Sequence, residues 1–326
     1  MHYLYKLKFP YGVHFGADKT GIGLEKISPN CHCDTLYSAI YHEVLKLHGE
    51  DEANNFYLET LKGDFLFTDL LPYTSRELMI PKPIIYLDRS KSEDEETSNS
   101  IKKKKMKKLQ FVPVLKIKDF FDGNIDEIKF HQPITYEKNS PSRNGDSKDN
   151  EIYSLSVTRF IDDCGLYFIV KMDENKKQWF DNIVTSLGLS GIGGKRTSGY
   201  GQFEIIDDFE LDENSPIKEE KELFKMLNSH SEYYLTLSAF YPNKEEISKL
   251  KEGYYSIIQR QGFVQSNTYS TKPLKKLPSC MINAGSCFKN KFNGTIFDVS
   301  LNGSHSVYRY GKPIMIGIDL WNNLDI

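Results

Sequence analysis

The glycine-rich segment of residues 191–201 holds the side chains best suited to chemistry in this chain. Five of its eleven residues are glycines, and two cations and two hydroxyl groups stand at its centre. Because glycine has no Cβ, the backbone can turn its N–H groups toward one point and a ligand can approach closely. Cations and hydroxyls at that point suit phosphate oxygens, so we predict an anion-binding loop. Its candidate binding residues are Gly191, Gly193, Gly194, Lys195, Arg196, Thr197, Ser198, Gly199 and Tyr200.

This segment does not fit the two glycine motifs that bind nucleotides. A P-loop requires a glycine five positions before Gly194, where Leu189 stands. It also requires Ser or Thr directly after Lys195, where this chain has Arg196. In the dinucleotide motif counted from Gly191, that same arginine occupies the place of the third glycine. No nucleotide cofactor is therefore expected. The alternative interpretation is a flexible surface loop without a ligand.

Composition limits the class of protein. The chain has 326 residues, of which 39% are hydrophobic and 27% charged, which favours two globular domains. No apolar run approaches the roughly 18 residues that span a membrane. The first residues alternate apolar and polar, as in a strand rather than a signal peptide. Five cysteines are an odd number, so we expect reduced thiols and a cytoplasmic location. The net charge is −3, so any nucleic-acid site must be a local basic surface.

The elements that must position the loop follow the order β-α-β-β-α-β. A strand is expected over 1–9, and a helix with one apolar face from Asp34, as its N-cap, to Gly49. Further helices are expected near 51–61 and over 174–187. The other expected strands are 65–67, 78–80, 165–171 and 202–206. This order is that of a ferredoxin-like fold, with the glycine loop between the second helix and the last strand.

The second half is expected to hold more strands, and to be a degenerate copy of the same fold. The last two expected strands, 307–310 and 314–319, form a hairpin around Gly311. We predict an α+β fold class with tandem ferredoxin-like (RRM-like) domains and a large insertion, or thumb, in the first. Within the insertion, 90–108 and 137–150 are highly polar and are expected to be mobile. The predicted boundaries are 1–206 for the N-terminal domain, about 82–155 for its insertion, 207–228 for a linker and 229–326 for the C-terminal domain.

Four sequence blocks resemble a known family. The glycine-rich segment is similar to the signature loop of the RAMP superfamily, the RNA-binding proteins of CRISPR systems. Residues 33–39 resemble the helix start of one family within it, the fourth Csm subunit of type III-A interference complexes. Residues 283–288 and 307–313 also resemble that family, whereas 260–263 match it less well. The resemblance covers most of the chain except about 88–160.

This resemblance implies tandem ferredoxin-like domains, a thumb and a non-catalytic role in antiviral defence. Such a subunit binds the 5′ handle of crRNA. It also contacts the large signalling and nuclease subunit and a backbone Csm subunit of the ribonucleoprotein complex. Lys195 and Arg196 would hold handle phosphates, and the two loop hydroxyls would bond phosphates or 2′-hydroxyls. Further candidate RNA contacts are His14, Tyr200, Arg260 and Arg309.

Each further contact has a structural alternative. His14 could be an ordinary loop residue, and Tyr200 is expected to pack more readily than it stacks on a base. Arg309 either stacks on RNA or pairs with an acid in a hairpin. Lys272, Lys275 and Lys276, in a loop after Phe263, either contact RNA or a partner subunit or are simply exposed, and exposure is favoured. The Cys31-His32-Cys33 spacing supplies too few ligands for zinc, so no metal site is expected.

Two other functions compete with this hypothesis. A CRISPR repeat endoribonuclease of the same superfamily would use a histidine for general acid–base attack by a 2′-hydroxyl. The candidates are His14, His32 and His42, but no second catalytic group is paired with them by spacing. An enzyme for a phosphorylated small molecule is disfavoured, because the phosphate motifs of such enzymes fail here.

Overall fold

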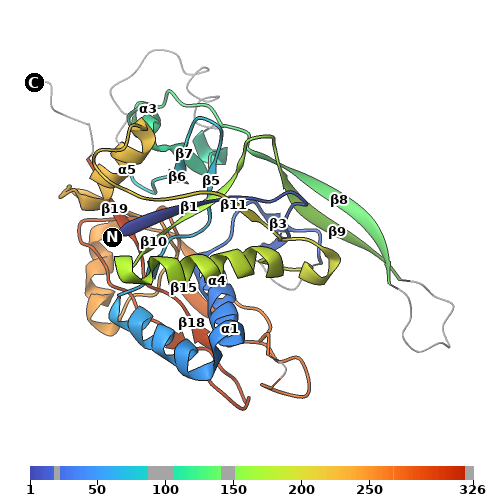
Figure 1. The fold of residues 1–326 in the computed structure, drawn as a ribbon. Helices are drawn as coiled ribbons and strands as arrows, with labels where there is room; N and C mark the ends of the chain where they lie inside the picture. Colours follow the sequence, from blue (N-terminus) through green and yellow to red (C-terminus); the bar gives the residue numbers. More distant parts are fainter. Residues whose placement is uncertain (18–22, 87–105, 141–150, 267, 320–326) are drawn as a thin grey trace, which may run out of the picture.

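Two antiparallel sheets organise the chain (Figure 1). The computed structural model describes residues 1–17, 23–86, 106–140, 151–266 and 268–319. The first sheet has the order β11-β1-β10-β4, with β5 also beside β10. These strands are β1 (His2–Lys8), β4 (Leu66–Phe67), β5 (Leu71–Tyr73), β10 (Gly165–Lys171) and β11 (Glu204–Glu210).

The central strands are buried on both faces, as their apolar sequences predict. In β10 every residue except Lys171 is buried. β1 pairs with it so that Tyr5 faces Phe168, and their rings stack with centroids 5.0 Å apart. The centre of this sheet is therefore a rigid support for the loops at its ends.

Two helices cover one face of this sheet. They are α1 (Cys33–Lys62) and α4 (Lys177–Ser190), which follows the short helix η2 (Glu174–Lys176). α1 is interrupted at Gly49, with φ 85° and ψ −176°, so the predicted helix end there and the second helix after it are confirmed. The prediction that Asp34 caps α1 is wrong. The N-cap is His32, and the carboxylate of Asp69 accepts the Cys33 N–H at 2.8 Å instead.

The opposite face packs against parts of both halves. β6 (Met79–Pro81) pairs with β7 (Phe111–Pro113), which leads into η1 (Val114–Lys116) and α3 (Ile117–Phe121). Beside them lies α5 (Lys218–Asn228), whose Leu223 is fully buried in the same core. The segment predicted as a linker, 207–228, thus holds the end of β11 and a packed helix, because its apolar residues fall on one helical face.

A long hairpin projects from the body beside the first sheet (Figure 1). Its strands are β8 (His131–Ser140) and β9 (Glu151–Phe160). At its base, Leu155 and Val157 are buried. The short pair β2 (Phe15–Gly16) and β3 (Ile27–Ser28) lies near this base. Of the segments predicted to be mobile, 90–105 and 141–150 lie outside the described residues.

The second sheet has the order β13-β16-β12-β19. The predicted hairpin around Gly311 is wrong: β18 pairs with β17, and β19 pairs with β12. The carbonyl of Gly311 instead accepts N–H groups from Tyr241 and Thr295, which turns the chain from one sheet to another. The second-half elements are β12 (Tyr233–Thr236), η4 (Lys244–Glu252), β13 (Gly253–Tyr254), β14 (Ile257–Arg260), β15 (Ser279–Ile282), β16 (Cys287–Phe288), β17 (Phe297–Asp298), β18 (Tyr308–Arg309) and β19 (Met315–Ile318).

The two halves share their cores. Ala239, Met281 and Tyr310 of the second half are buried in the cluster that α1, α4 and β1 form. The phenol of Tyr310 accepts the backbone N–H of Phe67 at 2.8 Å. None of the helices within the described ranges is long and apolar enough to cross a membrane.

Candidate nucleic-acid interface

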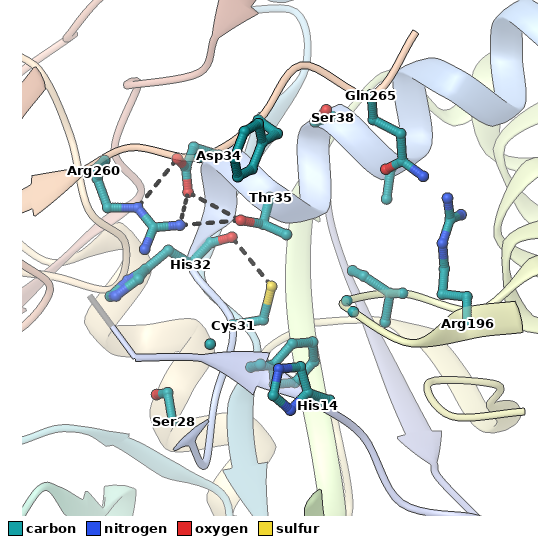
Figure 2. A pocket seen from close by; sticks show the side chains of 18 of the residues that line it. His14, Ser28, Cys31, His32, Asp34, Thr35, Ser38, Arg196, Arg260 and Gln265 are labelled. Carbon is teal, nitrogen blue, oxygen red and sulfur yellow. Dashed lines mark hydrogen bonds and ion pairs between the residues drawn. The ribbon is translucent and has the colours of Figure 1, made fainter. Parts of the chain in front are cut away.

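A polar pocket lies where the glycine loop, the start of α1 and the loops after β14 meet (Figure 2). Its volume is about 260 Å³. The charged side chains that line it are Arg196, Arg260, Lys276, Arg309 and Asp34. Four cations therefore face one carboxylate, in a chain whose net charge is −3. Such a local excess of positive charge attracts anions.

Backbone geometry explains why the loop is rich in glycine. α4 ends where Gly191, at φ 77°, donates its N–H to Leu187 O at 2.7 Å. A short helix, η3 (Arg196–Ser198), then begins after Lys195, which has a left-handed φ of 59°. Gly201 has φ 84°, and a Cβ there would lie 2.1 Å from the carbonyl oxygen of Ile192. The glycines are thus required for the path of the chain.

The loop amides do not converge on a ligand as predicted. Six of them already donate to backbone carbonyls, so they serve the fold of the loop. These amides belong to Gly191, Ile192, Gly194, Ser198, Gly199 and Gly201. Side chains must therefore provide more of any anion binding than the glycine pattern indicates.

The loop side chains point in different directions. Arg196 lines the pocket and extends toward Gln265 (Figure 2). The Lys195 ammonium instead lies 5.0 Å from the ring centroid of Tyr153 on the projecting hairpin. Tyr200 packs under Lys138 of that hairpin, with 5.1 Å from ammonium to ring centroid. Thr197 lines a neighbouring cavity, whereas Ser198 and Gly199 are not among the residues that line the pocket.

His14 is joined to the glycine loop by backbone pairing. Its carbonyl accepts the Gly194 N–H at 2.9 Å, and a Cβ on Gly193 would lie 2.7 Å from the same oxygen. Its Nδ1 donates to the carbonyl of Ser156 at 2.8 Å. The ring is nearly buried but lines the pocket. The structure thus brings His14, Gly191, Gly193, Gly194 and Arg196 together, as predicted.

Arg260 and Arg309 are held by protein groups rather than presented for RNA. Arg260 donates from Nη2 to Asp34 Oδ1 at 2.8 Å and from Nε to Oδ2 at 3.2 Å. Arg309, whose side chain is 3% exposed, donates to Arg260 O at 2.6 Å and to Ser279. Of the two predicted alternatives for Arg309, the structure shows the second, pairing with an acid, because its Nε lies 3.6 Å from Asp34 Oδ2.

The electrostatics of Asp34 follow from this arrangement. Burial alone would raise the pKa of its carboxyl group. The charge and hydrogen bonds of Arg260, together with Arg309, outweigh burial and lower that pKa below its ordinary value of 3.8. Asp34 is therefore ionised at neutral pH and fixes the floor of the pocket.

Sequence reasoning did not place three groups at the open side of this pocket. For Lys276 it favoured simple exposure over a contact with RNA or a partner subunit, and it considered His42 only as a nuclease candidate. Gln265 had no sequence signal, because a glutamine in a loop has no diagnostic spacing. All three line the pocket. Only the tertiary fold brings residues of α1 and of the second half to the glycine loop.

The cysteine and histidine cluster at 31–33 is part of the protein interior. His32 Nδ1 lies 2.7 Å from Asp69 Oδ2, and the Cys33 thiol donates to Ala239 O at 3.0 Å. Burial raises the pKa of the Cys31 and Cys33 thiols well above their ordinary value. Within the described ranges, no group of three or more His, Cys, Asp or Glu side chains is arranged to hold a metal ion.

Sequence comparison finds relatives along most of the chain. Residues 229–318 match the family described as the CRISPR Csm4 C-terminal domain. The chain is 31% identical to CRISPR system Cms protein Csm4 of Mycobacterium tuberculosis, over 94% of each protein. It is 29% identical to the protein of that name from Streptococcus thermophilus, over 97% of this chain and 99% of the relative.

Solved structures share the fold. A chain of the Csm3–Csm4 subcomplex in the type III-A CRISPR-Cas interference complex matches with a TM-score of 0.65 at 20% identity, covering 98% of this chain and 99% of that one. A chain of the Csm1–Csm4 cassette in complex with cA4 matches with a TM-score of 0.60 at 18% identity, covering 99% and 100%.

Proposed function

The chain belongs to the Csm4 family, and from this premise we propose that it is a non-catalytic, RNA-binding subunit of a type III-A CRISPR interference complex. In this proposal it binds the 5′ handle of crRNA in the cytoplasm and links the large subunit to a backbone subunit. The relatives named above and the complexes that contain Csm4 with Csm1 or Csm3 support the assignment.

The observation that carries RNA binding is the charge of the pocket. Asp34 is matched by Arg260 and Arg309 within the protein, so the charges of Arg196 and Lys276 remain for a ligand. RNA carries one phosphate per nucleotide, and its single strands expose phosphates and 2′-hydroxyls to such side chains. His14, Gly193 and Gly194 would form the wall along which the strand lies.

We also infer the finer fold and its boundaries. The order β11-β1-β10-β4 supports a ferredoxin-like N-terminal domain of the RAMP superfamily. The insertion of about 82–155 supplies the thumb, which is the β8–β9 hairpin. A second domain, with α5 packed between the two, spans about 229–326 and is proposed as a degenerate copy of the first.

The test measures RNA affinity directly. Fluorescence anisotropy would give the Kd of a labelled single-stranded RNA that carries the repeat-derived handle. We expect Arg196→Ala to weaken binding by about tenfold, because it removes a charged hydrogen bond to phosphate. Lys195→Ala should weaken it less, since Lys195 faces Tyr153. Lys225→Ala is the control, because that exposed lysine lies on α5, with Glu222 as its partner.

Two outcomes would count against RNA binding. One is an unchanged Kd for the double variant Lys195→Ala, Arg196→Ala. The other is wild-type binding that is no tighter for handle RNA than for an unrelated RNA of equal length. Pull-down with the purified Csm1 and Csm3 partners tests the bridging role separately.

The endoribonuclease alternative is not favoured by these relatives, which are Csm4 proteins. Two of its three histidine candidates have one ring nitrogen engaged by other protein groups. His14 and His32 each use Nδ1 within the protein, with Ser156 and Asp69 respectively. Incubation of the chain with repeat RNA in the absence of metal should leave the RNA intact.

A further inference from the structure

Three cavities meet on the outer side of α1, beside the glycine loop. The pocket described above is the first. A second, of about 550 Å³, lies between α1 and the end of α4, and a third, of about 370 Å³, lies between α1 and the segment before β18. His42 and Gln265 line all three cavities. Arg196 lines the first and second, and Lys276 the first and third. We call these four residues the junction.

The cationic and imidazole groups of the junction make few hydrogen bonds or salt bridges to the described part of the protein. Within the described part of the chain, neither the His42 ring nor the Lys276 ammonium makes a hydrogen bond or a salt bridge. Arg196 donates to the carbonyl of Gly191 at a long 3.4 Å. The three side chains come from α1, the glycine loop and the second half, so the fold gathers them from distant parts of the sequence.

Two of the three nearby carboxylates are engaged by other protein groups, and the third, Glu50, lines only the third cavity. Asp34 is shared by two guanidinium groups. Glu43 accepts from Ser186 at 2.7 Å and pairs with Lys46 at 3.4 Å. The junction therefore keeps an excess of positive charge at a place that solvent can reach.

The pKa of His42 depends on its burial and on these neighbouring charges. Burial lowers the pKa of His42 below its ordinary value of 6.5, and the charges of Lys276 and Arg196 lower it further. His305 also lowers it, and Glu43 alone acts in the opposite direction. His42 is therefore neutral at neutral pH in the free protein, first because it is largely buried and second because cations surround it.

We propose that His42, Arg196 and Lys276 bind one phosphate group of an RNA strand, and that His42 takes up a proton as the phosphate arrives. Gln265 donates an amide N–H to the same group or to the adjacent ribose. This inference rests on the proposed function and assigns the place where the strand crosses from the first domain to the second.

The direction of the pH effect follows from the charges. A phosphate beside His42 stabilises the imidazolium, so the pKa of His42 in the complex exceeds its pKa in the free protein. RNA affinity therefore increases as the pH falls through the pKa of the complex. It levels off below the pKa of the free protein. Between the two values, binding takes up a proton.

The experiment is calorimetric titration of the full chain with handle RNA bearing a 5′-hydroxyl. It is run in two buffers of different ionisation enthalpy at about pH 6.5. We expect proton uptake by the wild type and none by His42→Gln. At about pH 8, where His42 is neutral even in the complex, the two proteins should have Kd values within about twofold. His230→Gln is the matched control, since that exposed histidine follows α5, and it should behave as wild type.

A second variant and a second RNA sharpen the result. Lys276→Gln should weaken binding about tenfold at both pH values, because it removes an ammonium group that a bound phosphate keeps protonated, although burial lowers the pKa of Lys276 in the free protein. RNA with a 5′-phosphate distinguishes the source of the group. Equal uptake with both RNAs assigns an internal phosphodiester, whereas uptake only with the 5′-phosphate assigns the terminal group.

The proposal is overturned if folded His42→Gln, judged by its thermal unfolding, keeps the proton uptake of the wild type. It is also overturned if the wild type binds both the 5′-hydroxyl RNA and the 5′-phosphate RNA with no proton uptake. Failure of the proposed function looks different, because the wild type would then not bind the handle RNA at either pH.

Discussion

The carboxylate of Asp34 forms ion pairs with the partly buried Arg260 and the buried Arg309, and the stability of the pocket therefore depends on one residue. Asp34→Asn would leave Arg260 and Arg309 without their common counter-charge. We expect a loss of about 3–5 kcal/mol in the free energy of unfolding, as for other broken buried ion pairs. Urea denaturation at neutral pH measures this. Asp207→Asn is the control, since its pair with Lys6 is nearly half exposed and is worth about 0–1 kcal/mol.

The stability difference between wild type and Asp34→Asn should also depend on pH, and the direction of this dependence follows from the pKa of Asp34. The folded-state pKa of Asp34 lies below its ordinary value of 3.8, so its contribution is complete above that pH. As the pH falls toward the lowered pKa, the contribution is lost. The difference in urea midpoint between wild type and Asp34→Asn should be constant from neutral pH to about pH 5 and should narrow below about pH 4. A difference that widens in acid would contradict this account.

Substitutions of two loop glycines distinguish the effect of a steric clash from the effect of a left-handed backbone conformation. Both Gly199 and Gly201 have φ 84°, but a Cβ on Gly201 meets the Ile192 carbonyl, whereas one on Gly199 has no neighbour within 4 Å. Gly199→Ala should cost about 1 kcal/mol of stability, from the left-handed backbone alone. Gly201→Ala should cost clearly more and should also weaken RNA binding, because the loop must move. If Gly199→Ala and Gly201→Ala had equal effects on the free energy of unfolding and on the Kd for RNA, close packing of the loop would be unimportant.

At this scale the sequence predicted residue types better than residue roles. The cations and glycines of 191–201 indicated an anion site, and Arg196 does line a positive pocket. Arg260 and Asp34 could not be paired in advance, since they lie 226 positions apart. His42 and Lys276 had no local pattern, because their proximity depends on how the two halves pack.

At the scale of elements, the β8–β9 hairpin is fastened to the glycine loop by two opposed contacts. Lys195 of the loop lies over Tyr153 of the hairpin, and Lys138 of the hairpin lies over Tyr200 of the loop. Each such contact contributes about 0.5–1 kcal/mol at a partly exposed site. The outer part of the hairpin, where Lys138 pairs with Tyr153, and the glycine loop should therefore move together.

Hydrogen exchange tests this coupling. Tyr153→Leu should raise the exchange rates of amides in both the hairpin around Tyr153 and the glycine loop by about two- to fivefold, the equivalent of losing one contact. Tyr86→Leu is the control, because that side chain is 71% exposed. Faster exchange in the hairpin alone would mean that the two elements open independently.

Periodicity predicted the order of the elements but not all their partners. The strand, helix and loop order around the glycine loop is as expected, because apolar spacing determines it locally. The Gly311 hairpin was wrong because sequence proximity favoured pairing β18 with β19. Hydrogen bonds from Tyr241 and Thr295 to Gly311 instead direct the two strands to different partners. Such long-range bonds leave no local signal.

At the scale of the whole molecule, the shared cores predict a single cooperative unfolding transition. Residues of the second half fill both major clusters, and Asp69 bonds the N–H of Cys33 and that of Ala239. Calorimetry of the full chain should show one peak. A separately expressed 229–326 fragment should lack a cooperative transition, since its share of the cores would be exposed to water. Two resolved peaks, or a fragment that melts cooperatively, would contradict the shared core.

The bond between Asp34 and Arg260 also has a consequence during synthesis. The glycine loop leaves the ribosome well before Arg260 and Arg309 do, because translation proceeds from the N-terminus. Until those arginines emerge, Asp34 places an uncompensated negative charge at the floor of the future pocket and repels RNA. If the chain binds RNA as proposed, the nascent chain should bind RNA weakly on the ribosome until its synthesis is nearly complete.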